Sequence, residues 1–213
     1  MKNTLRITTL VVGQMAANCY IVCDTSTNKS LIIDPGDDAE YIIDTTLKLK
    51  VEPIGILLTH GHFDHVMSAF ELQIAYGIPC MMHPADKFLL TRMTETAEHF
   101  LGVARADPPP TITTPLHDGQ TIAIGNTVVS IREIAGHTPG SVLVYHKESA
   151  SIFVGDVLFA EGAVGRTDHA YSSPRDLAQS IHTILSYPDT TKIYSGHGES
   201  TTVELAKSYR SVS

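Results

Sequence analysis

Residues 59–65, with the sequence THGHFDH, place four potential metal ligands within six positions. They directly follow the apolar run 54–58, whose lack of alternation predicts a strand buried on both faces. A tight loop at the end of a strand can direct alternate side chains into one cavity, and Gly61 lets the backbone fold closely around them. Imidazole and carboxylate groups suit zinc or iron. The segment therefore predicts a metal site with the ligands His60, His62, Asp64 and His65.

Three further candidate ligands each follow a glycine where an expected strand gives way to a loop. They are His137 in GHTPGS, Asp156 in VGD and His197 in SGHG. A ligand next to glycine indicates that the main chain comes close to a neighbour at that point. With the first four, they make seven candidates. Seven is too many for one tetrahedral zinc and suits two metals about 3.5–4 Å apart that share a carboxylate.

Short segments rich in valine, isoleucine and threonine predict the strands that would carry these loops. The expected strands are 5–12, 18–23, 30–33, 54–58, 80–82, 121–124, 127–134, 142–146, 151–154 and 192–194. Helices are expected at 39–49, capped by Asp37 or Asp38, and at 66–76, 86–101 and 174–186. The polar segment 86–101 leads into Arg105-Ala106-Asp107 and three prolines, so we expect an insertion or lid over a site there. Strands and helices in both halves favour a layered α/β sandwich with its helices outside.

The composition is that of a soluble globular protein, with 43% hydrophobic and 18% charged residues among 213. This length predicts one domain over residues 1–213. The net charge of −8 gives no electrostatic reason to expect nucleic acid or an anionic membrane as a partner. Cys19, Cys23 and Cys80 show no disulfide or zinc-ribbon spacing, which favours a reducing compartment. Without an apolar run of signal-peptide or membrane-spanning length, the expected location is cytoplasmic.

These motifs together resemble the metallo-β-lactamase superfamily, from Asn18-Cys19-Tyr20 to Gly196-His197-Gly198. The resemblance implies a four-layered αββα sandwich with its site at one edge, between the sheets. It further implies that two divalent metal ions are held there, with zinc as the first choice and iron or manganese as alternatives. Under this resemblance, His60, His62 and His137 hold the first metal, Asp64, His65 and His197 hold the second, and Asp156 bridges them.

Within the superfamily, the segments IDPG at 33–36 and GRTD at 165–168 resemble short hydrolases of the glyoxalase II type, the hydroxyacylglutathione hydrolases. This implies hydrolysis of a small-molecule thioester such as S-lactoylglutathione by a metal-bound bridging hydroxide, which Asp64 would orient as a catalytic residue. Arg166 stands where the family has a glutathione-binding residue, but a structural ion pair with Asp168 is an equally weighted alternative. The chain ends sixteen residues after His197, so the C-terminal helical domain of the longer enzymes is expected to be missing.

Other chemistries share this ligand pattern. A persulfide dioxygenase would hold one iron with His60, His137 and Asp156, while Asp64, His65 and His197 would surround that site. Hydrolysis of another ester or a lactone, and a non-catalytic metal-binding role, are further alternatives. Metal analysis combined with substrate assays distinguishes these activities. The sequence does not predict an oligomeric state. A surface position is favoured for His169, with a place beside the substrate as the alternative. The remaining histidines are expected to be surface residues or satisfied residues of strands and helices: His83, His99, His117, His146 and His182.

Overall fold

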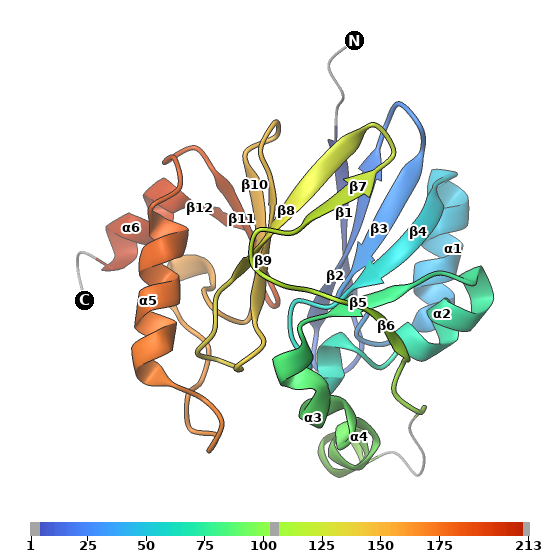
Figure 1. Cartoon of the computed structure of the whole chain (residues 1–213), viewed down its shortest axis with the longest axis horizontal. Helices are drawn as coiled ribbons and strands as arrows, with labels where there is room; N and C mark the ends of the chain where they lie inside the picture. The colour runs from blue at the N-terminus through green and yellow to red at the C-terminus, as the bar shows by residue number, and fades with distance from the viewer. Residues whose placement is uncertain (1–4, 103–106, 211–213) are drawn as a thin grey trace.

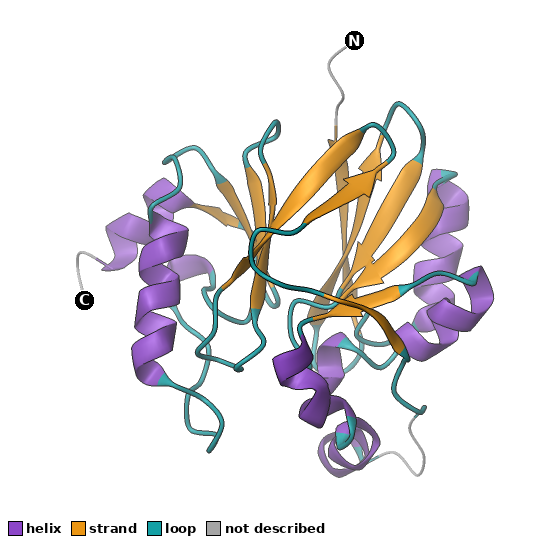
Figure 2. Ribbon diagram, in the orientation of Figure 1, coloured by secondary structure: helices purple, strands orange, loops and turns teal. Residues whose placement is uncertain are grey.

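Two six-stranded sheets pack face to face at the centre of the computed structural model, which describes residues 5–102 and 107–210 (Figure 1). Helices cover the outer face of each sheet, so the layers run helix, sheet, sheet, helix (Figure 2). The expected α/β architecture, a four-layered αββα sandwich, is therefore confirmed.

The first sheet has the strand order β1-β2-β3-β4-β5-β6. Its strands are β1 (Leu5–Val12), β2 (Ala17–Asp24), β3 (Lys29–Ile33), β4 (Glu52–Leu57), β5 (Cys80–Met82) and β6 (Ile112–Pro115). The strands β3 to β6 run parallel, joined by crossovers that place helices on the outside. Parallel strands end at the same edge, so the residues that follow β3 and β4 emerge side by side.

The second sheet has the order β12-β11-β10-β9-β8-β7. Its strands are β7 (Thr121–Ile124), β8 (Thr127–Glu133), β9 (Val142–His146), β10 (Ser151–Gly155), β11 (Lys192–Ser195) and β12 (Thr201–Thr202). The strands β10 and β11 are parallel, whereas β9 is antiparallel to both β8 and β10. The β8–β9 loop and the carboxyl ends of β10 and β11 therefore lie at one edge.

The helices bury apolar side chains against the sheets. Two of them, α1 (Ala39–Leu49) and α2 (Ala69–Tyr76), cover the first sheet, and α5 (Pro174–Leu185) and α6 (Val203–Arg210) cover the second. Pro174 occupies the first turn of α5, where the Ser173 hydroxyl accepts a hydrogen bond from the Asp176 N–H. At α1, Asp38 is in the N-cap position but makes no side-chain cap; its carboxylate instead accepts from the Gly13 N–H at 3.2 Å.

Three clusters of buried apolar side chains correspond to the three interfaces between layers. Tyr20, Leu57 and Phe153 belong to the cluster between the two sheets. Ile42 and Leu72 join the cluster under α1 and α2, and Ile181 joins the cluster under α5. All three cysteines are buried and free, as expected for a chain without a disulfide framework.

The segment 86–101 differs from its expected form. It contains two short helices, α3 (Lys87–Leu90) and α4 (Met93–Leu101), rather than one. Leu90, Met93 and Ala97 are buried in the core cluster of the first sheet, so this segment packs into the main layers and is not a detached lid. The expected extension through Arg105 and Ala106 lies outside the described residues.

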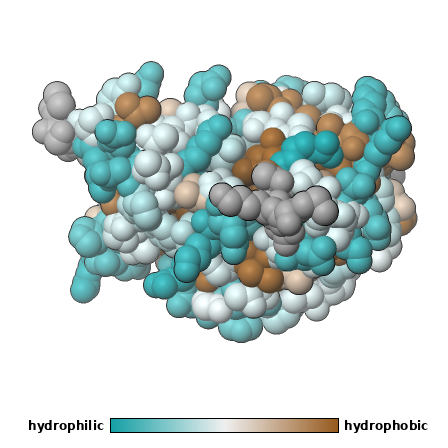
Figure 3. All heavy atoms as spheres, turned by 90° about the horizontal axis from the view of Figure 1, so that it is seen from above, coloured by the Kyte–Doolittle hydropathy of each residue, from teal (hydrophilic) through white to brown (hydrophobic). Residues whose placement is uncertain are grey.

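Most of the expected strands and helices are confirmed with small shifts at their ends. The helix expected at 66–76 begins only at Ala69, because a 3-10 turn, Phe63–His65, precedes it. The prediction missed β6, β12 and α6, of which the two strands are short. Among the described residues, no helix combines the length and apolar character that crossing a membrane requires. On the face drawn in Figure 3, hydrophobic residues form small separate groups among hydrophilic ones.

Candidate metal centre

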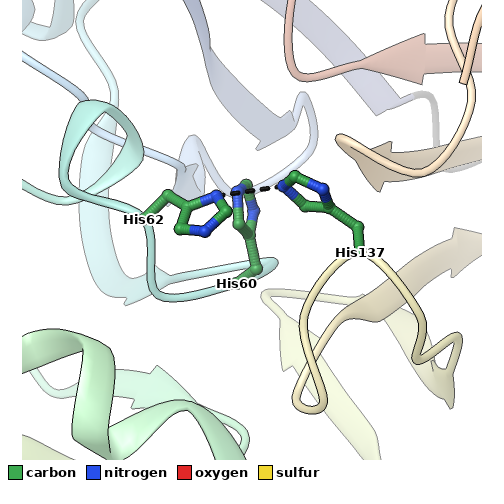
Figure 4. A group of neighbouring side chains, drawn as sticks. All are labelled: His60, His62 and His137. Carbon is green, nitrogen blue, oxygen red and sulfur yellow. Dashed lines mark hydrogen bonds between the residues drawn. The ribbon is translucent and has the colours of Figure 1, made fainter. Parts of the chain in front are cut away.

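Three histidines from the two sheets meet at the shared edge. His60 and His62 follow β4, and His137 lies in the β8–β9 loop. One ligand nitrogen from each ring lies within 4.8 Å of the others, and Figure 4 shows the three rings converging from the two loops. The Nδ1 atom of His62 is 3.0 Å from Nε2 of His137. These residues form the first of two groups of potential ligands.

A second group combines Asp64, His65 and His197, whose ligand atoms also lie within 4.8 Å of one another. The Nε2 atoms of His65 and His197 are 3.3 Å apart, and Nε2 of His197 is 3.3 Å from Oδ2 of Asp64. His197 follows β11, whereas the other two belong to the turn after β4. The second group therefore also joins the two sheets.

Asp156, at the carboxyl end of β10, faces both groups. Its Oδ1 atom is 3.4 Å from Nε2 of His65. Its Oδ2 atom is 3.6 Å from Nε2 of His197 and 3.9 Å from Nε2 of His137. One carboxylate thus contacts members of both groups, and the structure brings all seven sequence-predicted ligands together at one place.

The donor atoms fit divalent cations. Among the described residues, Nε2 of His60 and Oδ1 of Asp156 are buried without a hydrogen-bond partner. Leaving such atoms unpaired costs about 1–3 kcal/mol each, and buried polar atoms are normally satisfied. Coordination would satisfy them, and five imidazoles with two carboxylates suit zinc, iron or manganese.

The electrostatics favour the cation-binding form of four ligands, the neutral imidazoles of His60 and His62 and the ionised carboxylates of Asp64 and Asp156. Burial, reinforced by neighbouring imidazoles, lowers the pKa of His60 well below its ordinary value and that of His62 to about 3, so both rings stay neutral. Burial opposes ionisation of Asp64 and Asp156, but His65 and His197 outweigh it and lower the pKa of both carboxyl groups. Burial opposes charging of His65 and His197, yet the two carboxylates raise the pKa of both imidazoles, which favours a proton on each ring that a bound cation would have to displace.

The glycines beside the ligands are required by close packing, as the sequence predicts. A Cβ atom on Gly155 would lie 2.4 Å from Oγ1 of Thr59, and one on Gly196 would lie 2.0 Å from Oδ1 of Asp156. On Gly136 it would lie 2.2 Å from the backbone nitrogen of Leu177. The loops that hold Asp156, His197 and His137 could not keep these positions with larger residues.

Asp34 supports the centre although the sequence interpretation gave it no role. It follows β3, is 1% exposed and accepts hydrogen bonds from both the N–H and the hydroxyl of Thr59. Its Oδ2 atom is 3.4 Å from Nδ1 of His65. Asp34 also groups with His60 and His65 as a potential ligand, but its oxygens already accept from Thr59, so it orients these residues. The IDPG motif after an apolar strand was the available signal.

Tyr171 was also missed, because an isolated tyrosine in a loop carries no sequence signal. Its hydroxyl is 2.9 Å from Nε2 of His62. His169 stacks on the Tyr171 ring with centroids 4.9 Å apart, and its own centroid is 5.8 Å from that of His62. The Phe88 ring packs edge-on against Tyr171, with centroids 5.2 Å apart. His169 therefore lies beside the ligand His62 while staying half-exposed, whereas the sequence favoured a surface position away from the site.

Arg166 pairs with Asp168 through two hydrogen bonds, of 2.6 Å from Nε and 2.5 Å from Nη2. Both side chains are exposed. The ion pair, one of the two equally weighted alternatives for Arg166, is present, and within it the guanidinium is already engaged. The backbone of Arg166 has a second role, because its carbonyl lies 3.0 Å from Nδ1 of His137 and accepts from that ring.

The remaining histidines stay apart from the seven ligands. His146 is buried and bonded to the hydroxyls of Thr127 and Ser149, and His83 pairs with Glu133. Within the described ranges, none of the five expected structural histidines joins a potential ligand group. Their structural interpretation agrees with the geometry.

Comparison with known proteins agrees with this architecture. Residues 12–197 match the model of the metallo-beta-lactamase superfamily, and the chain belongs to that superfamily. Metallo-hydrolase chemistry is therefore the general class of activity to which the fold and the histidine–aspartate groups point.

Three relatives are informative within the superfamily. The hydroxyacylglutathione hydrolase GloC of Haemophilus influenzae is 33% identical over 205 residues, which cover 95% of each chain. The structure described as the BLEG-1 B3 metallo-beta-lactamase has a TM-score of 0.86 and 31% identity, with 95% of this chain and 97% of that chain covered. TTHA1623 in a di-iron-bound form has a TM-score of 0.83 and 33% identity, with 94% and 96% covered.

Proposed function

We propose that this chain hydrolyses a small-molecule thioester, such as S-lactoylglutathione, at a centre of two divalent cations. The first cation would be held by His60, His62 and His137, and the second by Asp64, His65 and His197. The observation that carries the proposal is the position of Asp156, whose carboxylate faces members of both groups at 3.4–3.9 Å. That arrangement suits a shared ligand between two metals.

When bound, the cations would lower the pKa of a water molecule and polarise the thioester carbonyl. Asp64 would orient that water, since its carboxylate is ionised and directed toward His197 at 3.3 Å. A thiolate is a good leaving group, so the reaction needs no strong general acid.

A shallow hollow borders Asp64 and is lined by Val12, Met15, Met67 and Leu101 among others. The GloC relative supports the thioester class by its name, while the name of BLEG-1 makes a β-lactam a necessary comparison substrate.

The persulfide dioxygenase alternative is less well supported. A mononuclear iron site would use His60, His137 and Asp156 only. Asp64, His65 and His197 would then have no ligand role, although their donor atoms lie within 4.8 Å of one another. The di-iron-bound form of TTHA1623 supports iron as a candidate metal in a two-metal centre. We propose zinc as the first choice.

The test combines metal counting with substrate assays on protein purified without added metal. Two metals per chain with thiol release from S-lactoylglutathione would support the proposal. One iron per chain with oxygen consumption on glutathione persulfide would overturn it. Esters, lactones and β-lactams belong in the same panel, because faster turnover of one of them would keep the two-metal centre but replace the substrate.

The remaining parts of the proposal concern context. We propose one domain over residues 1–213, a small-molecule substrate without a nucleic-acid or membrane partner, and a cytoplasmic location. The net charge of −8 supports the exclusion of polyanions. The cations would offset some of this charge locally and favour an anionic thioester.

A further inference from the structure

Asp86 is a buried carboxylate that contacts two of the ligand-bearing loops without being a ligand. It ends the 3-10 turn Pro84–Asp86 and is 0% exposed. Its Oδ2 atom accepts hydrogen bonds from the Gly61 N–H at 2.9 Å and the Thr138 hydroxyl at 2.7 Å. Its Oδ1 atom accepts from the Gly140 N–H at 2.7 Å.

These donors come from opposite sheets. Gly61 separates His60 from His62 in the loop after β4, and Thr138 follows His137 in the β8–β9 loop. Asp86 thus bonds to both loops that supply the first group of histidines. The distance across that group, 3.0 Å between His62 and His137, depends on how these loops are held relative to each other.

We propose that Asp86 is a positioning residue, which holds the two loops at the separation that the first cation requires. This rests on the proposed metal centre and adds a residue to it. In metal sites, groups that orient the ligands typically change metal affinity or activity by about 10–100-fold when they are replaced.

The geometry requires a carboxylate at this position. A carboxylate only accepts hydrogen bonds, whereas an amide presents one oxygen and one NH₂ group. In an asparagine, the NH₂ group would face the Gly140 N–H in one orientation and the Gly61 N–H in the other. Either orientation brings two donors together, so asparagine would push one loop away.

Close packing leaves the loops little space to adjust. A Cβ atom on Gly140 would lie 2.7 Å from Cγ of Asp86, and one on Gly61 would lie 3.0 Å from the Asp86 backbone oxygen. Both glycines therefore allow the backbone of their loop to approach Asp86. The contact is thus formed by three segments of the chain: the turn that ends at Asp86, the loop with Gly61 and the loop with Gly140.

Asp24 provides a matched control. It is also 0% exposed, and it accepts from the N–H groups of Ser26 and Asn126 and from the hydroxyls of Ser26 and Thr27. It joins the β2–β3 turn to the β7–β8 turn, at the opposite end of β2 from the metal edge. Replacing it should reduce stability in the same way as replacing Asp86, without moving a ligand loop.

The experiment compares Asp86→Asn and Asp24→Asn with the wild type by zinc titration against a chromophoric chelator and by the absorption spectrum of bound Co²⁺. We expect both variants to unfold at lower temperature. Only Asp86→Asn should bind one zinc about 10–100-fold more weakly, with an altered Co²⁺ spectrum. Unchanged zinc affinity in Asp86→Asn, or equal weakening in both variants, would overturn the proposal.

A second pair of variants decides the question if Asp86→Asn does not fold. Thr138→Val removes one hydroxyl donor to Asp86, and Ser26→Ala removes one to Asp24. Weaker zinc binding only in Thr138→Val supports the role of Asp86, while equal affinities overturn it. If the wild type binds no zinc, the proposed metal centre fails as well. If both the wild type and Asp86→Asn bind two zinc ions with equal affinity, only the positioning role fails.

Discussion

Asp34 accepts two hydrogen bonds from Thr59, one from the backbone N–H at 2.7 Å and one from the hydroxyl at 2.6 Å. Asp34 follows β3 and Thr59 follows β4, so this pair joins the ends of two neighbouring parallel strands. The same carboxylate lies 3.4 Å from Nδ1 of His65. Asp34 therefore contacts the loop after β4 at two points, at its start through Thr59 and at its last ligand, His65.

Replacing Asp34 with asparagine should weaken the metal centre. The amide would present its NH₂ group either to Thr59 or to His65, and the loop would shift. We expect zinc affinity about 10–100-fold below that of the wild type, measured by chelator competition. Asp44→Asn, on the exposed face of α1, is the control and should bind zinc as the wild type does.

Removal of the metals should lower thermal stability, because each group of ligands joins the two sheets. A ligand present at about 1,000 times its Kd contributes about 4 kcal/mol. For a chain of this length, about 2–4 °C in Tm corresponds to each kcal/mol. Dialysis against a chelator should therefore lower Tm by about 8–16 °C for each cation removed. Adding zinc back should restore it, and a Tm that is indifferent to both treatments would contradict the two-metal centre.

Breaking the Arg166–Asp168 pair should change substrate binding. Asp168→Asn should free the guanidinium and lower KM for an anionic thioester several-fold, whereas Arg166→Ala should raise it. Stability should change little, since the pair is exposed. Asp118→Asn breaks a comparable exposed pair with Arg132 and should leave KM unchanged. If neither variant of the first pair changes KM, its role is structural only.

Asp24 predicts a pH dependence of stability that is separate from the metals. Burial opposes its ionisation, but hydrogen bonds from Asn126, Ser26 and Thr27 outweigh burial and lower its pKa to about 2. The pKa of an aspartate in an unfolded chain is about 3.9. The stabilisation that the ionised Asp24 carboxylate contributes is therefore complete above that pH and is lost as pH falls toward 2.

The stability difference between wild type and Asp24→Asn should follow the same course. It should be on the order of 2 kcal/mol near neutral pH, as expected for hydrogen bonds to a buried charge. Denaturant unfolding at a series of pH values below 5 should show the difference shrinking. A difference that grows toward low pH would contradict the assigned cause.

Gly196→Ala should disrupt the shared carboxylate. The added Cβ would lie 2.0 Å from Oδ1 of Asp156, so that side chain must move. We expect the occupancy of both metals to fall, measured by elemental analysis after gel filtration. Gly119→Ala is the control, because the φ of 76° at Gly119 strains any added side chain, whereas no atom lies within 4 Å of the added Cβ. It should lose stability and keep its metals.

The central elements were predictable because their signals are local. Both β1 and α1 begin and end as expected, since apolar runs and punctuating residues mark their limits. The two-residue β12 was missed because so short a strand carries no pattern of its own. The segment 86–101 was misinterpreted because its polar surface concealed the buried Leu90, Met93 and Ala97.

The sequence by itself determined which seven side chains could bind metals, since residue type and the neighbouring glycines are local properties. Only the tertiary structure decided that Asp156 lies between the two groups, because its distances to His65 and His137 depend on how the sheets pack. The same holds for Asp34 and Asp86. Each has its hydrogen-bond partners at least 25 residues away along the chain, so only folding brings those atoms together.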